Sequence, residues 1–162
     1  LMGDSAGGNI ASVISIIASE KNDFKINKQI LLYPLTYHIH DENSQFKSVK
    51  ENGNSWILTN KRINNYLDLY VSDKSKINSK YVAPFNADEL YNQPNTLIIT
   101  AEYDPLRDEG EAYGKRLKEF KNEVKIYRVK EVIHGFFTYF PNSKENKKCY
   151  KLINNFIKGE KS

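Results

Sequence analysis

Continuous apolar runs alternate along this chain with apolar residues at helical spacing, and this alternation predicts the order of the elements. Ile30–Tyr33 and Thr96–Ala101 are short apolar runs, typical of strands that are covered on both faces of a parallel sheet. Val124–Val129 alternates apolar and polar residues, which indicates a strand near a sheet edge. We interpret Leu1-Met2 as the end of one further strand.

Apolar residues at spacings of three and four predict four helices. The first follows a glycine-rich turn near the start of the sequence, and the others are expected over Trp56–Val71, Arg107–Phe120 and Glu145–Ile157. Thr59 is a candidate N-cap for the second helix. The apolar stripes expected to be buried are Ile10, Val13, Ile14 and Ile17 in the first helix, Ile63, Tyr66, Leu67 and Tyr70 in the second, and Tyr150, Ile153 and Ile157 in the last.

The resulting order is strand, helix, strand, insertion, strand, helix, strand, helix. Such alternation predicts an α/β fold with a mainly parallel sheet that is flanked by helices. The insertion contains polar residues 36–55 and an irregular stretch, Ser72–Asn95, which Pro84 and Pro94 interrupt. A length of 162 residues fits one domain of ordinary size.

Composition excludes several classes of function. The 24 basic and 20 acidic residues give a net charge of +4 and are interspersed, whereas nucleic-acid-binding proteins cluster their basic residues on one face. No apolar run approaches the ~20 residues of a membrane-spanning helix. Cys149 is the single cysteine, so no internal disulfide can form. This fits a reducing compartment, and we expect a cytoplasmic location.

Gly3-Asp4-Ser5-Ala6-Gly7 matches the G-x-S-x-G pattern, in which a nucleophilic serine sits on a sharp turn between a strand and a helix. The turn would lift the Ser5 hydroxyl above the carboxyl end of the sheet. The N–H of Ala6 would lie at a helix N-terminus, where it can stabilise an oxyanion. An ordinary strand-to-helix turn is the alternative interpretation, but the position at a strand end favours the nucleophile.

A serine nucleophile needs a base, and the sequence holds three histidines. His38 and His40 have a spacing that could suit a metal, but no cluster of cysteines or carboxylates completes a site. We therefore expect both to be surface residues of a loop. His134 follows the last predicted strand, so it is expected at the same edge of the sheet as Ser5. A histidine packed among aromatic residues is the alternative for His134.

A carboxylate is needed to orient the imidazole, and Asp104 directly follows the second buried strand. Asp108 and Glu102 are rivals. Asp108 is expected in the first turn of the next helix, where its charge favours the helix dipole, and Glu102 lies nearer the strand end. We favour Asp104, and the chain order Ser5, Asp104, His134 is the order used on the α/β-hydrolase sheet.

Together these features resemble the hormone-sensitive-lipase-like family of α/β-hydrolase esterases, from residue 1 to about residue 158. The matching strings are GDSAGGN at Gly3–Asn9, EYDPLRDEG at Glu102–Gly110, HGF at His134–Phe136 and ILTNKRINNYLDLY, which resembles a helix of the family's cap. The resemblance implies that Ser5 is the nucleophile, Asp104 the triad acid and His134 the general base. It implies hydrolysis of carboxylic esters, with short acyl or small aromatic groups, and no cofactor or metal.

The sequence departs from the family at the oxyanion hole. Members carry an HGGG-type string well upstream of the nucleophile, and no HGG string occurs here. We therefore expect residues 1–162 to correspond to the C-terminal half of such a catalytic domain, with Ala6 as the remaining donor. About 37–78 would be a partial cap or lid, in which Trp56, Tyr66 and Tyr70 are candidates to line the substrate pocket.

Two functions of different classes stay open. The first is a serine carboxylesterase that acts on a small-molecule ester. The alternative is a catalytically incompetent fragment or binding module that retains the three residues without an oxyanion hole. Such a fragment could self-associate or pair with a complementing N-terminal half, because a truncated sheet exposes an edge strand. Nucleic-acid binding would rest only on the calculated pI near 9.0.

Overall fold

A parallel four-stranded sheet forms the centre of the computed structural model, which describes residues 1–54 and 56–160. The strands are β1 (Met2–Asp4), β2 (Lys28–Leu32), β3 (Asn95–Tyr103) and β4 (Val124–Ile133), and each pairs with the next one along the chain. All four predicted strands are confirmed, and β4 extends beyond the predicted end at Val129. The α/β prediction is therefore correct.

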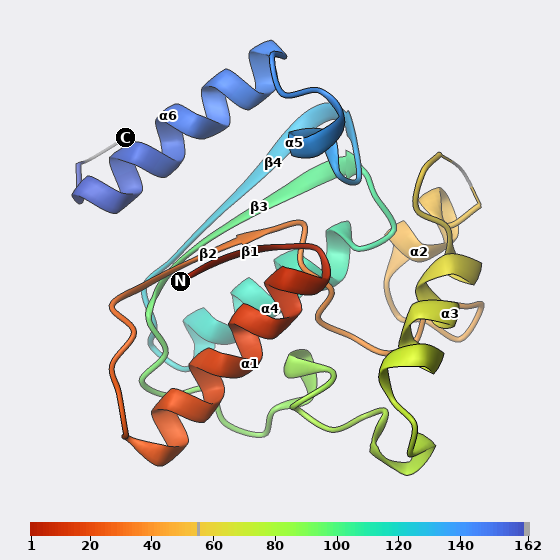
Figure 1. Ribbon diagram of the computed structural model, residues 1–162, viewed down its shortest axis with the longest axis horizontal. Helices are drawn as coiled ribbons and strands as arrows, with labels where there is room; N and C mark the ends of the chain where they lie inside the picture. Colours follow the sequence, from red (N-terminus) through yellow and green to blue (C-terminus); the bar gives the residue numbers. More distant parts are fainter. Residues whose placement is uncertain (55, 161–162) are drawn as a thin grey trace.

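Helices cover both faces of this sheet (Figure 1). On one face, α1 (Ala6–Lys21) and α4 (Arg107–Glu119) enclose a core around Leu31 and Ile98. On the other face, α6 (Lys144–Lys158) encloses a core around residues such as Ile99. Neighbouring residues of one strand thus enter opposite cores, which explains why the strands read as continuous apolar runs.

Helix positions were predicted well, but their buried faces were not. In α1 the buried positions include Gly8, Ala11, Ser12 and Ser15, whereas Ile10 is 49% exposed. The reason is a close approach between the helix and the chain that follows β2, since a Cβ on Gly8 would lie 2.9 Å from the Cβ of Pro34.

The other two stripes are only partly correct. In α3 (Asn60–Tyr70), Ile63 and Leu67 are buried while Tyr66 and Tyr70 are exposed. In α6 only Ile153 of the predicted stripe is buried, and Tyr150 and Ile157 are exposed. The buried face of α6 is instead completed by Asn146, Cys149 and Phe156.

The first part of the insertion between β2 and β3 lies at the end of the sheet where the strands terminate, and its last part returns past α1 to the start of β3 (Figure 1). The insertion contains α3 and a short helix, α2 (Lys47–Asn52), which its polar sequence did not reveal. Thr59 caps α3 as predicted, because its hydroxyl accepts a hydrogen bond from the backbone N–H of Arg62 at 3.3 Å. Ser55 lies outside the described residues.

Asn9 joins both ends of the insertion to α1. Its side-chain amide donates to the carbonyl of Leu35 at 2.9 Å and to the carbonyl of Val82 at 2.7 Å. Asn9 is 3% exposed, so both hydrogen bonds are shielded from water. Within the described part of the chain, no helix is both long and apolar enough to cross a membrane.

Candidate active site

Three strand ends bring the predicted site residues together. Ser5 follows β1, Asp104 follows β3 and His134 follows β4, all at the carboxyl edge of the sheet. The Nε2 atom of His134 lies 2.9 Å from the Oγ atom of Ser5. Its Nδ1 atom lies 2.7 Å from the Oδ2 atom of Asp104. The three side chains therefore form one continuous hydrogen-bonded relay.

The turn that carries Ser5 is tight and strained. Ser5 has φ 53° and ψ −119°, a left-handed conformation that is costly for a residue with a side chain. A Cβ on Gly3 would lie only 2.1 Å from the carbonyl oxygen of Gly7, so the first glycine of the pattern is a steric requirement. A Cβ on Gly7 would meet nothing closer than 3.7 Å, so the second glycine is not.

Ala6 is the first residue of α1. The backbone N–H groups of the first helical turn have no acceptor within the helix and carry the positive end of the helix dipole. The N–H of Ala6 is thus one donor beside the Ser5 hydroxyl. The backbone carbonyl of Ser5 is fully hydrogen-bonded, since it accepts the N–H of Asn9 at 3.1 Å and that of Leu35 at 3.3 Å.

Asp104 is fully buried, and both of its oxygens have partners. While Oδ2 faces His134, Oδ1 accepts the backbone N–H of Leu106 at 2.9 Å, which fixes the carboxylate plane. The rivals are engaged elsewhere. Glu102 accepts the N–H of Glu131 at 2.8 Å, and Asp108 occupies the first turn of α4 as predicted.

The contacts of Asp108 explain why its carboxylate is ionised, so its charge needs no catalytic explanation. Its carboxylate binds the Arg107 guanidinium and accepts the backbone N–H of Ser48, both at 2.8 Å. Burial alone would favour the neutral acid, but these two partners outweigh it and lower the pKa of Asp108. Asp108 therefore anchors the start of α2 to α4.

The loop that carries His134 is held by a left-handed glycine and by α6. Gly135 has φ 75°, which lets the chain turn directly into α5 (Phe136–Tyr139). The side-chain amide of Asn146 donates to the carbonyl of Phe137 at 3.2 Å and to that of Phe140 at 3.0 Å. Asn146 is fully buried, and no local sequence pattern points to this role.

The prediction that both other histidines lie on the surface is wrong for His40. His40 is 1% exposed, and its Nε2 atom lies 2.7 Å from Oε2 of the buried Glu109. The other oxygen of Glu109 accepts the backbone N–H groups of Thr36 at 2.6 Å and Tyr37 at 3.0 Å. His38 is half-buried, and this burial lowers its pKa. These contacts make Glu109 the anchor of the segment after β2.

A metal site is not assembled around the histidines. Among residues 1–54 and 56–160, no group of three or more His, Cys, Asp or Glu side chains gathers in a way that could hold a metal ion. The alternative raised by the spacing of His38 and His40 therefore has no support in the geometry.

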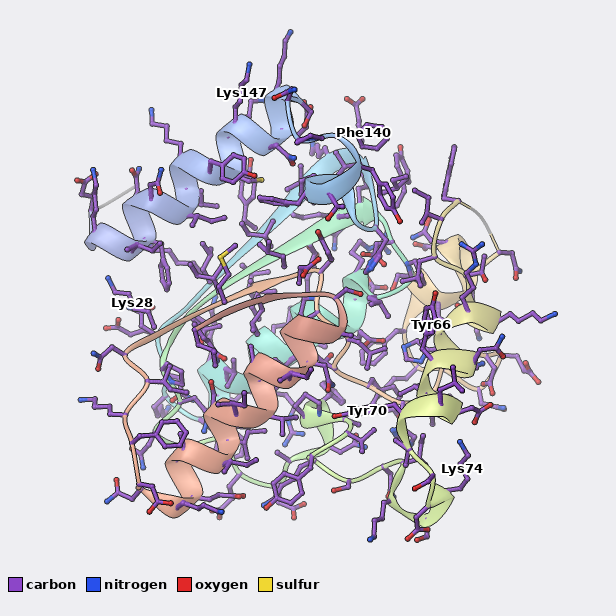
Figure 2. The ribbon with its side chains drawn as sticks, in the orientation of Figure 1. Lys28, Tyr66, Tyr70, Lys74, Phe140 and Lys147 are labelled. Atoms are coloured by element: carbon purple, nitrogen blue, oxygen red, sulfur yellow. The ribbon has the colours of Figure 1, made fainter. Side chains whose placement is uncertain are left out.

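An apolar pocket of about 410 Å³ adjoins the Ser5 turn. It is lined by Ala6, Asn9, Ile10, Leu35, Tyr66, Leu67, Leu69 and Tyr70. Figure 2 shows Tyr66 and Tyr70 along α3, on the side that faces α1. Trp56 does not line this pocket and instead contributes to a separate groove with Tyr103 and Phe140.

Comparison with known proteins identifies the family. Residues 1–138 match a family model described as the alpha/beta hydrolase fold. The chain is 33% identical over 135 residues to an arylesterase of Saccharolobus solfataricus, covering 83% of this chain and 42% of that protein. It is 34% identical over 142 residues to a carboxylesterase of Mycobacterium tuberculosis, covering 85% of this chain and 43% of that protein.

A solved structure agrees in shape as well as in sequence. The hyperthermophilic esterase from the archaeon Pyrobaculum calidifontis matches with a TM-score of 0.89 and 37% identity, over 98% of this chain and 50% of that one. The chain spans about half the length, or slightly less, of the relatives that it matches. On the evidence of the family match, the fold and the arrangement of the site, this chain belongs to the hormone-sensitive-lipase-like esterases of the α/β-hydrolase fold.

Proposed function

We propose that this chain carries the catalytic residues of a serine carboxylesterase, with Ser5 as nucleophile, His134 as general base and Asp104 as the orienting acid. The observation that carries the proposal is the relay itself, with 2.9 Å between Ser5 Oγ and His134 Nε2 and 2.7 Å between His134 Nδ1 and Asp104 Oδ2. These distances lie within the range expected for a nucleophile, its base and the orienting group.

The relay supports a two-step reaction. The Ser5 oxygen attacks the carbonyl carbon of the ester while His134 Nε2 takes the hydroxyl proton, and Asp104 accepts the Nδ1–H and stabilises the imidazolium. His134 then gives this proton to the leaving alcohol, which leaves an acyl group on Ser5. A water molecule attacks the acyl group, gives a proton to His134, and the acid leaves as the proton returns to Ser5.

The oxyanion that forms in each step carries a full negative charge. The N–H of Ala6, at the positive end of the α1 dipole, is the donor that we assign to it. Removal of one oxyanion donor in a well-studied protease costs about 10²–10³ in kcat, so the number of donors matters for the rate.

We propose that the ester carries an uncharged apolar group on one side of its carbonyl. The pocket beside Ala6 has a volume of about 410 Å³, and no charged side chain lines it. A pocket of this size fits a short acyl chain or a small aromatic ring. The arylesterase and carboxylesterase names of the relatives are consistent with this class of substrate.

Residues 37–78 would act as a partial cap over this pocket. Tyr66, Leu69 and Tyr70 of α3 form its outer wall, while Ala6 and Ile10 of α1 form its inner wall. In this proposal the nucleophile and the wall that selects the acyl group belong to different parts of the chain. Substitutions in α3 are therefore expected to change the preference for acyl length more than the rate of the chemical step.

Labelling with a fluorophosphonate probe tests the assignment of the nucleophile. The protein should react covalently at Ser5, and Ser5→Ala should abolish both labelling and hydrolysis of p-nitrophenyl acetate. Ser12→Ala is a matched control, because Ser12 is a buried serine of α1, the helix that follows Ser5, and its hydroxyl donates to the Gly8 carbonyl. Labelling that persists in Ser5→Ala would overturn the proposal.

A binding module without turnover is the alternative outcome of the same assay. It would take up no probe and release no p-nitrophenol although the fold is intact by circular dichroism. Self-association, or pairing with a complementing N-terminal half, is a separate proposal about partners. Sedimentation velocity over a hundredfold range of concentration tests self-association, and a sedimentation coefficient that stays constant would exclude it.

A further inference from the structure

Tyr33 occupies an unusual backbone conformation directly after β2. Its φ is 36°, in the left-handed region that side-chain-bearing residues rarely adopt. It also precedes Pro34, which disfavours helical conformations in the residue before it. Its N–H donates to the carbonyl of Ile99 on β3 at 2.6 Å, which fastens the strained residue to the sheet. A strained residue of this kind persists only where the surrounding structure imposes it.

The strain directs the aromatic ring of Tyr33 against the base of the relay. The ring centroid lies 4.8 Å from that of His134, with an interplanar angle of 61°. It lies 5.7 Å from the ring of Phe136, at 64°. Tyr33 is 1% exposed, so water does not compete for this contact.

This ring contact supplies a restraint that the relay lacks. The hydrogen bonds that join His134 to Ser5 and to Asp104 hold the imidazole at its two nitrogens, which flank one carbon of the ring. Two such anchors still permit the ring to tilt about the line that joins them. An aromatic ring packed edge-on against the imidazole opposes this tilt, because edge-to-face packing is a preferred arrangement of aromatic rings.

The hydroxyl end of Tyr33 is also held. It donates to Oδ2 of Asp4, the residue before Ser5, over a long distance of 3.4 Å. Burial, followed by the negative charge of Asp4, raises the pKa of the Tyr33 phenol above its usual range. The phenol therefore stays protonated and acts as a donor. Tyr33 thus contacts Asp4 through its hydroxyl and His134 through its ring.

We propose that Tyr33 is a positioning residue for His134, whose ring keeps the imidazole in line between Ser5 and Asp104. This inference rests on the proposed function, since it assumes that His134 is the base. Tyr33 does not exchange protons with the substrate. Tyr33 contributes by restraining the orientation of the His134 imidazole. The aromatic ring provides this restraint, and the hydroxyl contributes little to it.

Two substitutions separate the ring from the hydroxyl. Tyr33→Phe keeps the ring and should retain kcat for p-nitrophenyl acetate within about threefold. Tyr33→Met keeps most of the apolar volume without the ring, and should lower kcat by about 10- to 100-fold with KM changed less than threefold, because a misplacement of ~1 Å can cost about 10² in rate. Tyr33→Leu is a second ringless variant in case Tyr33→Met does not fold.

Tyr113→Met is the matched control, because Tyr113 is a fully buried tyrosine that packs around Leu31 and Ile98, on the other face of the sheet. It should lower the midpoint of thermal unfolding like Tyr33→Met but leave kcat within threefold. Equal losses of kcat in both variants would overturn the inference, and so would unchanged kcat in Tyr33→Met or a tenfold loss in Tyr33→Phe. Ser5→Ala is assayed alongside, so an active Ser5→Ala enzyme signals failure of the proposed function instead.

Discussion

Replacing Glu109 by alanine is expected to destabilise the fold strongly, although Glu109 takes no part in the proposed chemistry. Its side chain is fully buried, accepts the N–H groups of Thr36 and Tyr37, and lies 2.7 Å from His40. The alanine variant would leave these donors in the interior without an acceptor. An unsatisfied buried polar group costs about 1–3 kcal/mol, so losing an acceptor shared by two backbone N–H groups and the His40 ring should cost about 3–5 kcal/mol in total.

A loss of about 3–5 kcal/mol is a large part of the ~5–15 kcal/mol that stabilises a typical domain. Urea unfolding followed by circular dichroism measures it as a shift of the midpoint. Glu109→Gln should cost less, because its side-chain oxygen can still accept the two backbone N–H groups. Glu111→Ala is the control on the same helix and should cost less, because it removes a partly exposed pair with Arg128, which contributes no more than about 1 kcal/mol, and a single hydrogen bond from the Thr100 hydroxyl. The reasoning fails if Glu109→Ala costs no more than Glu111→Ala.

Three further predictions concern other parts of the molecule. Gly3→Ala should reduce fluorophosphonate labelling at least 100-fold, because the new Cβ would collide with the Gly7 carbonyl. Gly7→Ala should keep labelling within threefold of the unsubstituted protein. Similar labelling of the two variants would contradict this steric account. Burial, followed by the charge of Glu145, raises the pKa of Cys149 to about 11, so native protein at pH 8 should react with a disulfide reagent at least 100-fold more slowly than unfolded protein. The free energy of unfolding should also fall as the pH rises above ~8.5, because the thiol then ionises in the unfolded chain but not in the native one. A native rate within tenfold of the unfolded rate would refute the raised pKa. Asn146→Ala removes the side-chain amide that donates to the carbonyls of Phe137 and Phe140, so it should lower kcat about tenfold and speed hydrogen exchange in α5. Unchanged exchange in α5 would show that the loop does not depend on these hydrogen bonds.

The positions of the three site residues could be predicted because they depend on topology. Ser5, Asp104 and His134 each directly follow a parallel strand, and parallel strands end at one edge of a sheet. Apolar runs therefore locate the site before any side chain is placed. Tyr33 obeys the same rule and could have been found by it, since it stands between β2 and Pro34.

The buried faces of the helices could not be predicted, because hydrophobicity is a poor guide where a helix packs very closely. Small residues such as Gly8 and Ser12 face inward in α1, and Ile10 is left half exposed. The burial of His40 was equally hidden, because its partner Glu109 lies far away in sequence. A polar residue can enter the interior only with a partner, and local patterns do not reveal partners at long range.

The two hydrogen bonds of Asn9 have a consequence for how such chains diversify. Because the side chain of Asn9 on α1 donates to the carbonyls of Leu35 and Val82, the segment between them is attached through backbone atoms, which every sequence possesses. Residues 36–81 can therefore change in sequence while the attachment itself is preserved. Leu35 and Val82 mark natural junctions for exchanging this segment between relatives, and such exchanges would test whether it carries the proposed substrate preference.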